Sequence, residues 1–210
     1  MPASLAVLSE RRQDQVNAAV AALDNGRTPI PPNLFPALAE PALRRVVEDV
    51  LAVSGRVLIT CTNGLISGYD DAIGARLADE GLGILPEIDR AILAVILIFS
   101  VAIPRAEGEL PPEASWTNGR PVPDEVFDGV AIQPVQVAPA IRRLTDADLI
   151  RVVPRKGRVL GAQFHRLTPR ATSFLFEQLV LLADPYGSLA DSIKRRRGHQ
   201  HRTTSQEASS

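Results

Sequence analysis

Apolar residues recur at helical spacing along much of the chain. The clearest case is residues 41–53, whose apolar positions are Leu43, Val46, Val47, Val50 and Leu51. This pattern predicts an amphipathic helix that is closed by Gly55. Residues 5–23 show the same spacing less regularly and predict another helix, which the polar run at 24–26 ends.

Residues 56–69 allow two interpretations. The β-branched run at 57–60 and the Asn63-Gly64 pair are typical of a β-hairpin. A short helix also fits this segment. Asp70 and Asp71 then stand where acidic side chains complement the dipole at the start of a helix.

A strongly apolar segment lies between Pro86 and Pro104. Pro86 suits the first turn of a helix, and Pro104 predicts that this helix ends near Ile103. Because the helix is apolar nearly all round, we expect it to lie in the centre of a core. It is shorter than the roughly 20 apolar residues of a membrane span. Residues 104–123 are rich in Pro, Gly and Glu and predict a long acidic loop.

Short patterns follow one another quickly in residues 123–185. Pro123 and Pro134 each open a predicted helix, and the second helix carries an apolar face. Residues 151–155 and 158–167 are predicted to be two strands joined by a Lys-Gly tip, and a long amphipathic helix follows from Pro169. Residues 186–210 lose this periodicity, contain four consecutive basic residues and predict a disordered tail.

One four-residue motif occurs twice. Residues 55–58 and 157–160 both have the sequence Gly-Arg-Val-Leu. Four residues are too few to predict an internal repeat, so we predict none.

Positive charge is concentrated in one segment, although the net charge of the whole chain is only −1. Residues 1–139 hold 10 basic and 18 acidic side chains, a balance of −8. Residues 140–170 hold 8 basic and 2 acidic side chains, a balance of +6. A focused basic segment of this kind favours contact with an anionic partner such as nucleic acid.

The succession of helix, helix, helix, hairpin and helix in residues 86–183 resembles the winged helix-turn-helix superfamily, in its MarR-like and GntR-like bacterial forms. The stretches that carry the resemblance are 132–144, 149–151 and the Gly-tipped hairpin that closes on Leu167-Thr168-Pro169. The resemblance implies a mainly α fold with a small antiparallel β-hairpin, that is, an α+β fold. The resemblance implies a winged helix-turn-helix domain at 84–185 that includes the 104–123 loop. The patterns described above predict a helical N-terminal region at 1–83 before it and a basic, disordered tail at 186–210 after it.

In such families the third helix enters the major groove and the hairpin, or wing, lies on the DNA backbone or in the minor groove. The resemblance therefore places a recognition helix near 134–144 and a basic wing near 151–167. Gln133, Gln136 and Arg142 would lie near base edges, where Gln can pair with adenine and Arg with guanine. Four further cations would meet phosphates, namely Arg143, Arg155, Lys156 and Arg158.

Two features depart from the family pattern. Pro139 stands inside the predicted recognition helix, where it removes one backbone hydrogen bond and should kink the helix. The 104–123 loop is long for a connection between helices, and we expect it either to contact a partner protein or to be a tolerated insertion. Because some winged helices bind proteins, both departures keep protein binding open.

Several classes of function find no support in the sequence. There is no Gly-rich phosphate loop, no His-Glu-x-x-His motif and no Gly-x-Ser-x-Gly motif, so we predict no enzymatic activity, catalytic residue or cofactor. The single cysteine, Cys61, cannot form an intramolecular disulfide or a paired-cysteine zinc site. A lone thiol fits a reducing compartment, and we expect a cytoplasmic protein without a membrane partner.

Together these features predict a DNA-binding protein, most simply a transcriptional regulator that acts on double-stranded DNA. We expect a homodimer, because one helix-turn-helix reads only a half-site. The alternative is a winged-helix adaptor subunit of a larger chromosome-organising or defence complex, with a partner protein on the 104–123 loop or the N-terminal helices. A third interpretation is a ligand-sensing protein with a pocket between residues 41–83 and the core helix.

Overall fold

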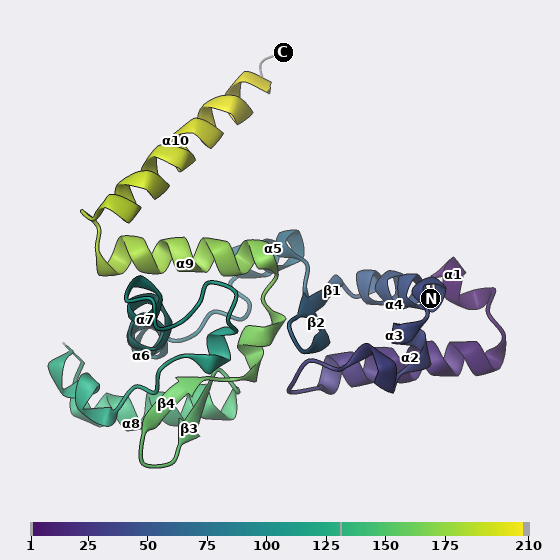
Figure 1. Cartoon of the computed structure of the whole chain (residues 1–210), viewed down its shortest axis with the longest axis horizontal. Coiled ribbons are helices and arrows are strands. Elements are labelled where there is room, and N and C mark those ends of the chain that lie inside the picture. The colour runs from purple at the N-terminus through teal and green to yellow at the C-terminus, as the bar shows by residue number, and fades with distance from the viewer. Residues whose placement is uncertain (1, 131, 208–210) are drawn as a thin grey trace.

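The computed structural model of the chain describes residues 2–130 and 132–207. Its elements are mostly helices, accompanied by two separate two-stranded antiparallel sheets. Figure 1 shows the N-terminal elements, in purple and blue, beside a larger C-terminal body in teal and green. The α+β class expected from the sequence is therefore confirmed, with a second hairpin in addition to the predicted one.

The N-terminal half packs its helices against a hairpin. Its helical elements are α1 (Ala3–Ala6), α2 (Glu10–Asn25), η1 (Pro32–Leu34), α3 (Pro36–Ala39) and α4 (Pro41–Val53). Their apolar faces meet in one core, which includes Val16, Leu23, Leu38, Leu43, Val47, Leu51 and Leu65. The helices predicted at 5–23 and 41–53 correspond to α2 and α4, although α2 begins only at Glu10.

The hairpin is the correct alternative for residues 56–69. Strand β1 (Arg56–Cys61) pairs with β2 (Gly64–Tyr69), and Thr62 and Asn63 form the turn. Ile30 adds a one-residue third strand, because its N–H donates to the Leu65 carbonyl and its carbonyl accepts from the Leu65 N–H. Gly64 is needed here: a Cβ would lie 2.4 Å from the Ile30 carbonyl oxygen, and its φ of 147° disfavours other residues.

Helix α5 (Asp71–Asp79) joins the halves. The Asp70 side chain accepts from the Ala72 and Ile73 N–H groups, so Asp70 is the N-cap, as its place in the sequence indicated. Figure 1 shows α5 between the N-terminal hairpin and the long helix α9.

The central helix of the C-terminal half does not end at Pro104, contrary to prediction. It runs through α6 (Glu87–Leu97), a π-helical segment η2 (Ile98–Ala102) and α7 (Ile103–Ala106). Because proline has no N–H, the Ser100 carbonyl lacks its helical donor. The backbone N–H of Arg120 donates to this carbonyl instead, with an N···O distance of 3.0 Å. The 104–123 loop therefore folds back onto the helix, which places Trp116 of η3 (Trp116–Asn118) in the core.

The remaining C-terminal elements follow in nearly the predicted order. They are η4 (Asp124–Gly129), α8 (Pro134–Asp146), β3 (Ile150–Val153), β4 (Gly157–Leu160), η5 (Ala162–Arg166), α9 (Pro169–Ala183) and α10 (Ser188–Glu207). Helix α8 continues through Pro139. The core of this half includes Ile92, Ile96, Val101, Trp116, Leu144, Ile150, Leu160 and Leu179.

Two predictions fail near the C-terminus. The strand expected at 158–167 ends at Leu160, because β3 offers only four residues to pair with, and the chain then turns into η5. The tail predicted to be disordered forms α10, whose Ala190 and Ile193 are buried while Arg196 and Arg197 pair with Glu177 of α9. Residues 208–210 of that tail lie outside the described residues.

The halves repeat one arrangement of elements. In each, a long helix leads to a single bridging residue, then a short helix, a longer helix and a hairpin. The bridge between Val122 and Arg158 repeats that between Ile30 and Leu65. In both halves a glycine starts the second hairpin strand against the bridging residue, Gly64 in one and Gly157 in the other. Because Gly157 corresponds to Gly64 and not to Gly55, the matching tetrapeptides at 55–58 and 157–160 do not mark this repetition.

Candidate interaction surfaces

Helix α8 and the β3–β4 hairpin present most of the side chains singled out from the sequence. Gln133, Gln136 and Arg142 are exposed on or beside α8. The helix turns this face outward because it buries Ala140 and Leu144 against the core. At the hairpin tip Arg155 and Lys156 are also exposed, and Arg155 has a φ of 61°.

Arg143, which was predicted to contact phosphate, pairs with a carboxylate of the same chain. Its Nε lies 2.8 Å and its Nη2 2.5 Å from the two oxygens of Asp89, a two-pronged pair that joins α8 to α6. Asp89 is 1% exposed, whereas the Arg143 side chain is 51% exposed. Hydrogen bonds from Arg143 hold the pKa of the Asp89 carboxyl below its ordinary value, and those same bonds raise the pKa of Arg143.

Arg158 is also held by the fold. It lies on β4 and its backbone forms the bridge with Val122, so it is not at the hairpin tip. Its side chain is 16% exposed and pairs with Asp124 of η4. Burial lowers the pKa of this guanidinium. Of the seven predicted contacts, two therefore have partners within the chain and five face outward.

The surroundings of these five side chains are not strongly basic. Asp124, Glu125 and Asp128 are exposed on η4, directly before α8. On α8 itself, Val135 is 76% exposed, and Ala138 and Pro139, at the i+3 and i+4 positions of the same helix, are also exposed. The face is thus apolar at its centre, acidic on one side and basic at the hairpin tip.

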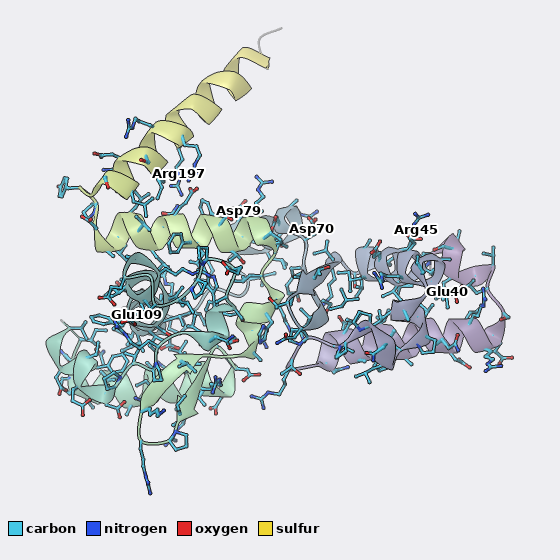
Figure 2. The ribbon with its side chains drawn as sticks, in the orientation of Figure 1. Glu40, Arg45, Asp70, Asp79, Glu109 and Arg197 are labelled. Carbon is cyan, nitrogen blue, oxygen red and sulfur yellow. The ribbon has the colours of Figure 1, made fainter. Side chains whose placement is uncertain are left out.

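The corresponding face of the N-terminal half is more acidic. Helix α4 exposes Arg45, Glu48 and Asp49, and Glu40 stands just before it. Figure 2 labels Glu40 and Arg45 at this end of the molecule. The hairpin turn Thr62-Asn63 carries no charge. This surface was not predicted, because the first half was not recognised as repeating the arrangement of the second.

Arg166 joins the two halves, and nothing local in the sequence indicates this role. Its Nη1 donates to the Ser67 carbonyl at 2.8 Å, to the Ser67 hydroxyl at 3.0 Å and to the Leu23 carbonyl at 3.3 Å. Its Nη2 donates to the carbonyls of Asp24 and Gly26 at 2.8 and 2.7 Å. The guanidinium therefore caps the negative end of α2. Burial is the main cause that lowers the pKa of Arg166.

Other classes of site can be tested directly. No group of three or more His, Cys, Asp or Glu side chains within the described residues is arranged to hold a metal ion. Across the same part of the chain, no helix combines the length and the apolar character that crossing a bilayer would require.

Comparison with known proteins adds little to this geometry. No known protein family and no curated protein matches the chain. A crystal structure of a conserved hypothetical protein from Chlorobium tepidum matches 80% of this chain and 99% of its own, at 16% sequence identity and a TM-score of 0.32. Similarity at that level carries no argument about fold or function.

Proposed function

We propose that the chain is a protein-binding adaptor made of two winged-helix modules, which holds a partner protein on the exposed face of α8. In each half, the order of long helix, bridging strand, short helix, second helix and hairpin agrees with a winged helix. The modules are held in one orientation by Arg166, so they would offer a partner a fixed surface. Such a protein would serve as an adaptor subunit of a larger chromosome-organising or defence complex.

The observation that carries this proposal is the composition of the α8 face. A DNA-binding face neutralises phosphates with several free cations, and acidic neighbours weaken that attraction. Here Asp89 and Asp124 pair with two of the predicted cations, while η4 adds two further carboxylates, Glu125 and Asp128, and α8 exposes Val135. Apolar centres with a mixed polar rim are typical of protein interfaces.

DNA binding remains the second candidate, because Arg142 on α8 and Arg155 and Lys156 at the hairpin tip are all exposed. The two candidates differ in what they require of the hairpin tip. A DNA-binding protein needs the tip cations, whereas an adaptor that uses α8 tolerates their reversal.

Fluorescence anisotropy with a random-sequence DNA duplex, across a salt series, separates the candidates. For an adaptor, we expect no binding at physiological salt, and the same result for an Arg155→Glu/Lys156→Glu variant. Micromolar binding that weakens steeply with salt and is lost in the variant would establish DNA binding and reject the adaptor.

Cross-linking in the native host tests the adaptor directly. The chain has two lysines, Lys156 at the hairpin tip and Lys194 on α10. We expect an amine-reactive reagent to link the partner to Lys156 and not to Lys194, and Val135→Glu to abolish the link. Val7→Glu is the matched control, since Val7 is 82% exposed directly after α1, far from α8. A partner whose cross-links survive Val135→Glu does not bind α8.

A further inference from the structure

A cavity of about 750 Å³ lies at the junction of the two halves. Its lining comes from the end of α2, the ends of the β1–β2 hairpin, the start of α5, η5 and the start of α9. No residue of α8, β3 or β4 belongs to it, so the inference below does not depend on the proposed function. Sites for small organic molecules have volumes of roughly 300–1,000 Å³ and occur often between domains.

Part of the wall is apolar. Phe164 of η5, Leu167 and the α9 residues Ala171 and Leu175 line one side, and Tyr69 at the end of β2 lies on the other half. At Gly74 of α5, an added Cβ would meet no atom within 4 Å, so the cavity is open at this point. Such walls can hold a hydrocarbon or aromatic body.

The charged groups in the lining do not balance. Three arginines and four aspartates line the cavity, which gives a formal charge of 3 − 4 = −1. Arg56 pairs with Asp24 at 3.1 Å, and Arg27 pairs with Asp148. Arg166 donates to the carbonyls and the hydroxyl described above, so the three cations have partners within the protein.

Asp70 and Asp71 are the carboxylates without a cationic partner. Asp70 Oδ1 accepts from the N–H groups at the start of α5, and Asp71 Oδ1 accepts from the Thr168 hydroxyl at 2.6 Å. Within the described structure, no hydrogen bond or ion pair reaches the Oδ2 atom of either residue. Both carboxylates therefore line an apolar-walled cavity with an oxygen free to accept.

We infer that this cavity binds a small organic cation, with an amine, amidine or guanidine group at Asp70 and Asp71 and an apolar body against Phe164, Leu167 and Leu175. One positive charge on the ligand neutralises the formal charge of the lining. A charge-assisted hydrogen bond to a carboxylate gives the cationic group its specificity. An anion of the same shape is disfavoured at the same place.

The test is a ligand-observed NMR screen of the full chain. The probes are a panel of monocationic amines, amidines and guanidines with apolar bodies, each paired with the carboxylate of the same body. We expect cations to bind and their carboxylate counterparts not to. If no cation binds, or if the carboxylates bind as well as the cations, the inference is wrong.

Variants locate the site. Asp70→Asn/Asp71→Asn removes both charges and keeps acceptors for α5 and Thr168, and we expect it to weaken the cations roughly 10- to 100-fold. Asp79→Asn/Glu80→Gln is the control: it removes the same charge from the other end of α5 and should not change binding. Figure 2 labels Asp70 and Asp79. Gly74→Leu should obstruct the cavity next to Asp70 and Asp71 and weaken binding without unfolding α5, since leucine favours helix more than glycine does. Binding that survives both Gly74→Leu and the charge removal lies elsewhere and overturns the assignment.

Discussion

Arg142 and Arg143 are neighbours on α8, yet only Arg143 is held by the fold. Its guanidinium balances the buried Asp89 carboxylate, which no other described cation contacts. The Arg142 side chain is exposed and makes no hydrogen bond or ion pair within the described residues. Replacement of Arg143 should therefore lower the stability of the fold, whereas replacement of Arg142 should not.

We predict that Arg143→Met lowers the free energy of unfolding at neutral pH more than Arg142→Met does, because the Asp89 carboxylate loses its charged donors. Arg142→Met, the control, should lower it by less than about 0.5 kcal/mol. Urea unfolding of both variants measures this. Equal losses would mean that the Asp89 pair does not stabilise the fold.

The same pair predicts a pH dependence. Arg143 holds the pKa of Asp89 below its ordinary value, so the stabilisation is complete above about pH 4 and is lost as the pH falls through the lowered pKa. The difference in unfolding free energy between the wild type and Arg143→Met should therefore shrink below about pH 4. A difference that stays constant down to about pH 2 would contradict this assignment.

Among the elements, the helix that crosses Pro104 depends on the loop after it. The Arg120 N–H donates to the Ser100 carbonyl, which Pro104 leaves without a helical donor. Gly119 allows the loop backbone to approach Ser100 closely enough for this hydrogen bond. A Cβ at Gly119 would stand 2.3 Å from the Ser100 hydroxyl oxygen and 2.4 Å from its carbonyl oxygen. We predict that Gly119→Ala destabilises the protein by about 1–3 kcal/mol.

Thermal unfolding of Gly119→Ala beside Gly129→Ala tests this prediction. A Cβ at Gly129 would meet nothing within 4 Å, so that variant should keep the stability of the wild type. If the two alanine variants unfold alike, the loop does not support the π-helical segment.

The elements also show which features a single sequence can predict. Helix α4 and the Asp70 cap follow from residues within a few positions of each other, so periodicity and capping chemistry suffice. The continuation past Pro104 depends on Arg120, and the early end of β4 depends on the length of β3; both are contacts between separate segments. For the candidate sites, exposure of Arg155 and Lys156 at a hairpin tip could be predicted, whereas the pairing of Arg143 with Asp89, 54 residues earlier, could not.

In the whole molecule, a few contacts decide whether the two halves act as one body. Besides Arg166, the described contacts between the halves include the Thr168–Asp71 hydrogen bond and the Arg27–Asp148 ion pair. The Arg27 side chain is 76% exposed, and exposed ion pairs stabilise little. Arg166 makes five hydrogen bonds to the other half and should therefore dominate.

We predict that the wild type unfolds in one calorimetric transition and that Arg166→Met unfolds in two, with a loss of about 3 kcal/mol in the N-terminal half. The loss arises because the last carbonyls of α2 lose the charged donor that caps them. Arg166→Lys should be intermediate, since one ammonium cannot replace a planar guanidinium that donates in several directions. Arg170→Met on the exposed side of α9 is the control.

Small-angle scattering should show a larger radius of gyration for Arg166→Met alone, because the modules then move independently. If Arg166→Met keeps one transition and an unchanged radius, the remaining contacts hold the halves together, and the fixed surface that an adaptor needs does not depend on this arginine.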